Sequence, residues 1–201
     1  MDIVALIMAG GRGLRMKLPV EKPLVKIVGK PMVEYVIDTL TKVSNIKRII
    51  VATTPHTPRT TKRMMNLSVE VIQTPKGEYV SDIQYAVRKL KLENVLTVSA
   101  DLPLITAEII GEIIKRFKAS GKSALTVCVP QYLSAKIGSR PKYTFEVDGK
   151  KVVPSGVNMI NGSRIDDLSL DQEILVMDSL ELAINVNTVK LLKMARNFAK
   201  Y

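Results

Sequence analysis

The sequence predicts an α/β fold: a three-layer sandwich around a Rossmann-like, mostly parallel sheet, with a small β-rich insertion near the C-terminal third. Two observations predict it. Short runs of apolar and β-branched residues alternate with segments of helical periodicity, and the first such run leads directly into a group of glycines. The chain has 201 residues, and because domains commonly hold about 100–200 residues, we expect a single domain over residues 1–201.

The elements of the first half follow from periodicity. Residues 3–8 are continuously apolar and predict a buried strand. Pro31 opens a helical pattern through residue 43, at a first-turn position and with apolar residues along one face. β-branched runs predict strands over residues 48–53, 69–73 and 94–99, and apolar spacing predicts helices over residues 81–92 and 106–119.

The second half is expected to be richer in strands. Residues 124–130 predict a fifth strand, and Asp148-Gly149 between two β-like runs, residues 143–147 and 151–153, predicts a hairpin. The remaining expectations are a strand over 157–160, a polar loop over 161–171, short strands over 173–177 and 183–186, and a terminal helix over 188–199.

The charge is strongly positive and uneven. The formal net charge is +11, and residues 1–63 hold 12 Lys and Arg against 4 Asp and Glu. Such a patch recruits an anion: nucleic acid, an acidic membrane or a phosphorylated small molecule. An aromatic content of 4% argues against base stacking, and no strongly basic amphipathic helix points to a membrane. We expect Arg59, Lys62 and Arg63 to form a solvated helix face, with an acceptor-phosphate site as the alternative.

Cysteine and histidine are scarce. Cys128 is the single cysteine, which excludes an intramolecular disulfide and a zinc site of several thiolates and fits a reducing compartment. His56 is the single histidine, which excludes chemistry that needs two. Because no apolar run is long enough to span a membrane and the N-terminus does not read as a signal peptide, we expect a cytoplasmic protein.

The most informative segment is the glycine-rich loop, residues 9–16, which follows the first strand. Ala9, Gly10, Gly11 and Gly13 let the backbone turn and present its N–H groups to an anion. Arg12, Arg15 and the later Lys22 add the forked and point charges that bind phosphates. The loop therefore predicts a triphosphate site. It is neither a P-loop nor a dinucleotide fingerprint, since both spacings are absent.

The A-G-G-x-G-x-R-M pattern of this loop, followed by Lys22-Pro23-Leu24, resembles that of the MobA-like nucleotidyltransferases. The resemblance implies an enzyme that joins a nucleoside monophosphate to a phosphorylated acceptor and releases pyrophosphate. Asp101, which follows the fourth strand, is a candidate Mg²⁺ ligand both by this resemblance and by its place in an α/β sheet. By resemblance Asn187 helps to hold the metal or the phosphates. An Asx-turn or helix cap at Asp101, and an ordinary N-cap at Asn187, remain open.

By the same resemblance, the loop before the helix at 81–92 reads the base. Gly77 would admit a purine, Asp82 or Glu78 would accept from a guanine edge, and a plain turn is the alternative. Further residues are assigned to the nucleotide pocket: Met8, Thr53 and Tyr79.

The C-terminal third narrows the resemblance. V-P-S-G-V-N at 153–158, E-I-L-V-M-D at 173–178 and N-V-N-T at 185–188 are similar to the archaeal-type adenosylcobinamide-phosphate guanylyltransferases. This implies GTP and adenosylcobinamide phosphate as partners, with Ser155, Gly156 and Asn158 facing the acceptor. A homodimer is left open, and nucleic acid and stable membrane insertion are not expected. The alternatives are molybdopterin or a sugar phosphate as acceptor, a GTP-binding protein without turnover, and a basic nucleic-acid-binding protein.

The expected mechanism needs no general base. The triphosphate of GTP lies on the N–H groups of the glycine-rich loop, Arg12, Arg15 and Lys22 neutralise its charge, and Mg²⁺ on Asp101 polarises the α-phosphate. A phosphate monoester has a second pKa of about 6, so the acceptor is already ionised when it attacks the α-phosphorus in line. Catalysis then rests on positioning and charge stabilisation.

Overall fold

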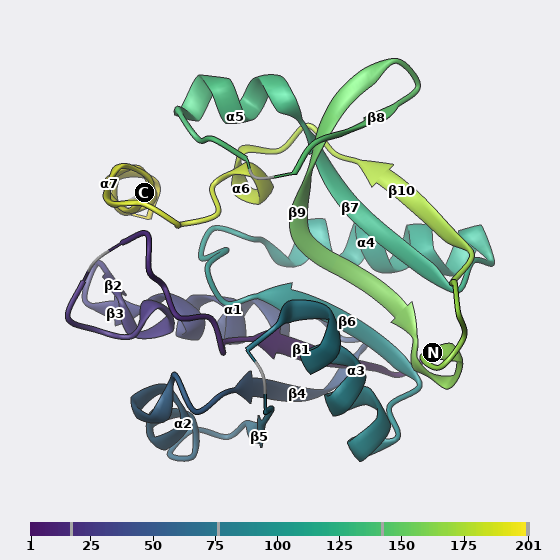
Figure 1. Cartoon of the computed structure of the whole chain (residues 1–201), viewed down its shortest axis with the longest axis horizontal. Coiled ribbons are helices and arrows are strands. Elements are labelled where there is room, and N and C mark those ends of the chain that lie inside the picture. The colour runs from purple at the N-terminus through teal and green to yellow at the C-terminus, as the bar shows by residue number, and fades with distance from the viewer. Residues whose placement is uncertain (17, 76, 142, 200–201) are drawn as a thin grey trace.

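The computed structural model describes residues 1–16, 18–75, 77–141 and 143–199. Its central sheet has the strand order β10-β7-β9-β6-β1-β4-β5, and β8 pairs with β9 beside it (Figure 1). The strands are β1 (Ile3–Met8), β4 (Ile46–Thr53), β5 (Glu70–Gln73), β6 (Asn94–Ser99), β7 (Ala124–Pro130), β8 (Phe145–Val147), β9 (Lys150–Asn161) and β10 (Gln172–Val176). A small second sheet pairs β2 (Lys26–Ile27) with β3 (Lys30–Pro31).

The sheet is mixed but mostly parallel, which confirms the predicted fold class. β1 runs parallel to β4 and β6, β4 to β5, and β7 to β10. β9 runs antiparallel between β6 and β7. The carboxyl ends of β1, β4 and β6 therefore meet at one edge, where open α/β sheets bind their ligands.

Helices cover both faces of the sheet (Figure 1). They are α1 (Met32–Thr41), α2 (Pro58–Met64), α3 (Tyr79–Leu90), α4 (Ala107–Ser120), α5 (Gln131–Ile137), α6 (Leu180–Ala183) and α7 (Val189–Phe198), with short 3₁₀ turns at Lys22–Leu24 and Gly162–Arg164. None of the helices in the described ranges is long and apolar enough to cross a membrane.

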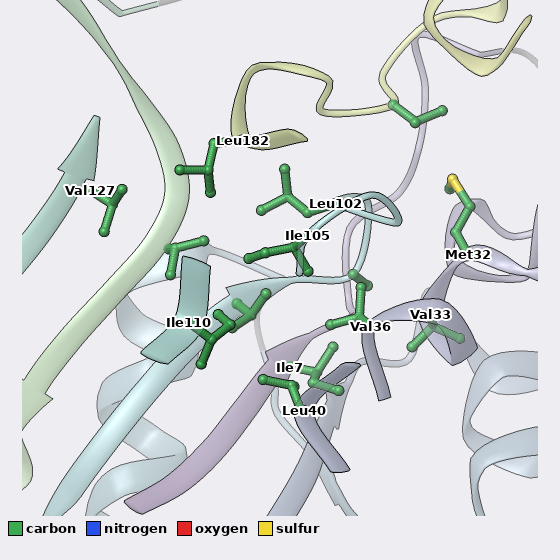
Figure 2. Close-up of a cluster of buried hydrophobic side chains, with 14 of the residues drawn as sticks. Ile7, Met32, Val33, Val36, Leu40, Leu102, Ile105, Ile110, Val127 and Leu182 are labelled. Carbon is green, nitrogen blue, oxygen red and sulfur yellow. The ribbon is translucent and has the colours of Figure 1, made fainter. Parts of the chain in front are cut away.

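The core has two parts, one on each face of the sheet, and successive side chains of β1 point into one or the other. Ile3, Ala5 and Ile7 face the larger cluster, which joins α1 and α4 to the sheet, whereas Leu6 faces the smaller cluster under α3. Figure 2 shows the larger cluster, whose members include Ile7 of β1, Leu40 of α1 and Ile110 of α4. The strand that leads into the glycine-rich loop is thus packed on both sides, which gives the loop a rigid base.

Most predicted elements are confirmed. β1, β6 and β7 have the predicted bounds, and β4, β5, β10, α1, α3, α4 and α7 lie within about two residues of theirs. The hairpin about Asp148-Gly149 is confirmed as β8 and β9. Pro31 serves as the N-cap of α1 rather than as its first-turn residue. The predicted 161–171 loop holds one 3₁₀ turn.

The chain departs from the predicted elements at several places, among them α6 and the β2–β3 pair, which were not predicted. The strand predicted at 183–186 is wrong: α6 ends at Ala183, and Val186 donates its N–H to the carbonyl of Asp101 rather than to a strand. The runs at 151–153 and 157–160 are one strand, β9, which passes through a register shift beside Gly156, whose φ is +89°. Helix α5 was not predicted.

Candidate active site

A pocket opens at the carboxyl ends of β1 and β6, between the glycine-rich loop and the start of α3. It is lined by twelve residues: Met8, Ala9, Gly10, Gly11, Lys22, Pro23, Gly77, Tyr79, Asp82, Ser99, Ala100 and Asp101. Nine of them were predicted as nucleotide-binding residues, and the fold brings them together from four separate parts of the chain.

Lys22 and Asp101 form the charged centre of this pocket. Lys22 Nζ makes an ion pair with Asp101 and lies 2.5 Å from Asn187 Oδ1. Asn187 in turn donates to Asn185. The carbonyl of Asp101 accepts from Val186 N at 2.9 Å, which attaches the C-terminal segment to the end of β6. The predicted site residues Lys22, Asp101 and Asn187 thus converge.

The two carboxylate oxygens of Asp101 differ in their contacts. Oδ2 is paired with Lys22, whereas Oδ1 is buried and has no hydrogen-bond partner within the described residues. A buried carboxylate oxygen without a partner is costly, and a cation that binds there would satisfy it. No cluster of three or more His, Cys, Asp or Glu side chains that could hold a metal occurs in the described ranges. A single carboxylate that lines the pocket fits Mg²⁺, which uses one or two protein carboxylates together with substrate phosphates.

The glycine-rich loop is shaped by close contacts that only glycine allows. A Cβ on Gly10 would lie 2.2 Å from Thr54 Cγ2, and a Cβ on Gly13 would lie 2.8 Å from Lys22 Cβ. Gly13 also has a φ of +64°, which side-chain-bearing residues rarely adopt. Gly13 lies behind Lys22 rather than lining the pocket, while Gly11 is exposed with open space around it.

Arg12 and Arg15 are exposed on this loop. Neither makes a hydrogen bond or an ion pair with another described residue. Neither arginine lines the pocket, but both lie on the loop that borders it. Their charge is therefore available to an anion that binds in the pocket.

The opposite wall is built by the start of α3. Gly77 has a φ of +74°, and a Cβ added to it would lie 3.3 Å from His56 Cδ2 and 3.8 Å from the carbonyl oxygen of Gly10. Asp82 is buried in the first turn of α3 and lines the pocket. Glu78 points its carboxylate at the Ser81 hydroxyl and is exposed. Of the two carboxylates considered for reading a base, Asp82 is thus the one inside the pocket. His56 is exposed beside it.

Tyr79 bridges α3 and the sheet. Its hydroxyl lies 3.2 Å from Asn158 Nδ2, 3.4 Å from the carbonyl of Gly156 and 3.5 Å from Thr97 Oγ1. The residue as a whole is 40% exposed, but its hydroxyl end is enclosed, and this burial raises the pKa of the phenol above its usual value, with the charge of Asp101 acting in the same direction. The tyrosine therefore stays neutral and closes one side of the pocket.

Two further predicted residues, Thr53 and Ser155, have side chains engaged away from the pocket. Thr53 is fully buried and its hydroxyl accepts from Thr61, so it supports β4 and does not line the pocket. Ser155 is buried and donates to the carbonyl of Val127 at 2.9 Å, so its hydroxyl holds β9 to β7. Gly156 and Asn158 do reach the rim of the pocket through Tyr79.

The sequence reasoning missed several residues that line the pocket or support its walls. Ser99, Ala100 and Pro23 line the pocket, and a Cβ on Gly156 would lie 2.6 Å from Ser99 Oγ. These residues could have been predicted because they neighbour Lys22 and Asp101 in the chain. Thr54 and Glu21 do not line the pocket, but they hold the glycine-rich loop from outside. Nothing in their local sequence pointed to that contact.

Arg59, Lys62 and Arg63 lie on the exposed side of α2, as expected for a solvated face. Arg63 makes a surface ion pair with Glu34, which holds the pKa of the Arg63 guanidinium above its usual value.

Comparison with known proteins points to one group. The MobA-like NTP transferase domain matches residues 5–137. An adenosylcobinamide-phosphate guanylyltransferase of Methanocaldococcus jannaschii is 34% identical over 208 aligned residues, which cover 98% of this chain and 97% of that protein. A probable molybdenum cofactor guanylyltransferase of Pyrococcus horikoshii is 34% identical over 132 residues, which cover 66% of this chain and 64% of that protein.

The fold is shared with more distant structures. A CMP:2-keto-3-deoxy-manno-octonic acid synthetase complexed with CTP superposes with a TM-score of 0.78 at 15% identity, over 100% of this chain and 99% of that one. At this identity the likeness concerns the fold alone.

Proposed function

The chain belongs to the MobA-like NTP transferase family, and from that premise we propose that it transfers GMP from GTP to adenosylcobinamide phosphate and releases pyrophosphate. The observation that carries the proposal is the convergence of Lys22, Asp101 and Asn187 on one pocket at the end of the glycine-rich loop. The similarity over 98% of the chain to the Methanocaldococcus jannaschii guanylyltransferase supports this choice of acceptor.

In this proposal the glycine-rich loop binds the triphosphate. The N–H groups of Gly10, Gly11 and Gly13 donate to phosphate oxygens, and Arg12 and Arg15 add forked donors from the exposed side of the loop. Lys22 leaves its ion pair with Asp101 when the phosphates arrive, because a more highly charged anion then competes for its ammonium group. These groups also stabilise the charge that collects on the departing pyrophosphate.

Asp101 and Asn187 are the residues that would hold Mg²⁺, since Asp101 Oδ1 is buried and free within the described residues and Asn187 offers an amide oxygen beside it. When bound, the metal supplies Lewis-acid polarisation of the phosphate oxygens. The acceptor phosphate has a second pKa of about 6 and is ionised at neutral pH, so the chain only has to orient it and exclude water.

The guanine base is proposed to lie between Gly77 and Asp82. The buried carboxylate of Asp82 lines the pocket, and a carboxylate can accept both donors on the edge of guanine. Asn158 and Gly156 lie beyond Tyr79 on the rim, on the side from which we propose the acceptor approaches.

The test is a transfer assay with a panel of acceptors. The protein is incubated with labelled GTP and Mg²⁺, together with adenosylcobinamide phosphate, molybdopterin or a sugar 1-phosphate, and both pyrophosphate and the labelled product are measured. We expect transfer to adenosylcobinamide phosphate and to no other acceptor. Transfer to molybdopterin or to a sugar phosphate instead would overturn the acceptor while keeping the reaction class. GTP binding without transfer to any acceptor would overturn the reaction.

A further inference from the structure

Glu21 precedes Lys22 in the chain, yet its carboxylate is bonded to a different element. Oε1 accepts from Arg59 N at 2.8 Å, and Oε2 accepts from Thr60 N at 2.7 Å and from Thr60 Oγ1 at 2.6 Å. These N–H groups belong to the first turn of α2, where backbone donors have no partner within the helix. One carboxylate therefore attaches the segment that carries Lys22 to α2.

The start of the glycine-rich loop is attached to the same region. Thr54 Oγ1 donates to the carbonyl of Gly10 at 2.8 Å. Thr54 is itself held in a tight turn, because its N–H donates to Thr57 Oγ1 at 3.1 Å and its carbonyl accepts from Thr57 N at 2.9 Å. Residues 54–60 thus hold both the start of the glycine-rich loop and the segment that carries Lys22.

This attachment fixes the position of the Lys22 backbone. The stem of Lys22 passes against Gly13, whose added Cβ would lie 2.8 Å from Lys22 Cβ, and its ammonium group reaches Asp101 and Asn187. A lysine side chain is flexible beyond its stem, so the position of its backbone limits where the ammonium group can lie. That backbone is set by Glu21 on one side and by Pro23, which is buried, on the other.

We propose that Glu21 is a positioning residue: by capping α2 it holds the backbone of Lys22 so that the ammonium group meets the phosphates of the nucleotide. This inference rests on the proposed function, in which Lys22 binds those phosphates. Glu21 does not line the pocket and touches no substrate, so it acts through Lys22.

A double-mutant cycle tests this route. Glu21→Gln keeps the size of the side chain and one acceptor oxygen, but it loses the charge and one of the two oxygens that α2 uses. The affinity for GTP is measured by calorimetry in the wild type, Glu21→Gln, Lys22→Ala and the double variant, with Tm recorded for each. Glu112→Gln, an exposed glutamate on α4, is the matched control and should bind GTP as the wild type does.

We expect Glu21→Gln to weaken GTP binding on the order of 10-fold to 100-fold in the background that keeps Lys22, since a hydrogen bond to a charged group contributes about this much to affinity. In the Lys22→Ala background it should weaken binding no further, although Tm should fall by the same amount in both backgrounds. Glu21→Asp, which keeps the charge, should restore part of the affinity, and it also serves if the glutamine variant does not fold.

Equal weakening of GTP binding in both backgrounds would overturn the proposal, since Glu21 would then act independently of Lys22. Unchanged affinity in Glu21→Gln or in Lys22→Ala would overturn it as well. The cycle measures GTP binding without any acceptor, so an incorrect acceptor would abolish transfer in the wild type and leave the result of the cycle readable.

Discussion

Lys22 and Asp101, 79 residues apart in the chain, form an ion pair at the centre of the pocket, with side chains only 14% and 15% exposed. Each partner has a second task in the proposed reaction: the lysine binds phosphates, and the aspartate holds the metal. In the absence of nucleotide the pair keeps both charges neutralised in a partly desolvated place, where an unpaired charge would be costly. The nucleotide with its metal can then replace each partner with an ion of the same sign.

Asp101→Asn should abolish most of the transfer activity and leave the chain folded. The amide keeps the shape of the side chain but loses the charge that would bind Mg²⁺, and we expect a loss of about 10²-fold or more in kcat. The measurement is the rate of GMP transfer, with Tm as the check on folding. Asp38→Asn is a matched control, because Asp38 pairs with Lys30 on the surface, where ion pairs contribute about 0–1 kcal/mol. Wild-type activity in Asp101→Asn would contradict the assignment.

Arg12→Ala and Arg15→Ala should each weaken GTP binding without changing stability. Both side chains are exposed and make no hydrogen bond or ion pair with other described residues, so the free energy of unfolding should change by no more than surface substitutions usually cause, about ±0.5 kcal/mol. A hydrogen bond to a charged group is worth about 1.5–3 kcal/mol, and we therefore expect KM for GTP to rise about 10-fold or more. Lys115→Ala, on the exposed side of α4, should change neither quantity. If the arginine variants behaved like Lys115→Ala, the triphosphate would lie elsewhere.

Gly10→Ala should lower both Tm and GTP affinity, because the added Cβ would lie 2.2 Å from Thr54 Cγ2. The structure offers a compensating change. Thr54→Ser removes Cγ2 but keeps the hydroxyl that donates to the carbonyl of Gly10, and the nearest remaining atoms are then 3.3 and 3.4 Å away. The double variant should therefore recover much of the lost Tm. Gly11→Ala, with nothing within 4 Å, should leave Tm unchanged. No recovery in the double variant would show that the glycine is needed for a reason other than this contact.

The strongly periodic elements could be predicted because burial and periodicity agree in them. In α4 the apolar positions Ile110, Ile113, Ile114 and Phe117 are all buried, and Thr106 caps the helix as its sequence indicates. The segment 183–186 shows the opposite case. Ala183, Ile184 and Val186 are buried, which made them look like a strand, but they pack into the larger core cluster without a strand partner. Apolar runs this short report burial and do not distinguish a strand from a packed turn.

The candidate site was predictable to the extent that its residues lie at strand ends. Asp101 and the glycine-rich loop lie close together because β6 and β1, which they follow, are parallel and finish at the same edge. The contacts that hold the glycine-rich loop were not predictable, since Glu21 bonds to α2 across 38 and 39 residues of chain. Thr53 was assigned to the nucleotide pocket, but it is the last residue of β4 and turns inward, whereas the next residue, Thr54, reaches Gly10.

Cys128 provides a test of the buried sheet that is independent of the active site. It is fully buried in β7, and burial raises the pKa of the thiol from its ordinary 9.0 to about 12. Below pH 9 the thiol is protonated in both the folded and unfolded chains and contributes no pH dependence. Between pH 9 and about 12 the unfolded chain loses the proton and the folded chain keeps it, so stability falls as the pH rises, by up to about 1.4 kcal/mol per pH unit.

The expected result follows from comparing the wild type with Cys128→Ala. At pH 8 the alanine variant should be the less stable of the two, because it leaves a small cavity in a packed sheet. As the pH rises from 9 to 11 this difference should shrink, since only the wild type carries the thiol that ionises on unfolding. Urea unfolding at fixed pH values measures the free energy of each, and other titrating groups cancel in the difference. A difference that stayed constant with pH would mean that Cys128 is solvated in the folded protein, and rapid alkylation of the native chain by iodoacetamide at pH 8 would lead to the same conclusion.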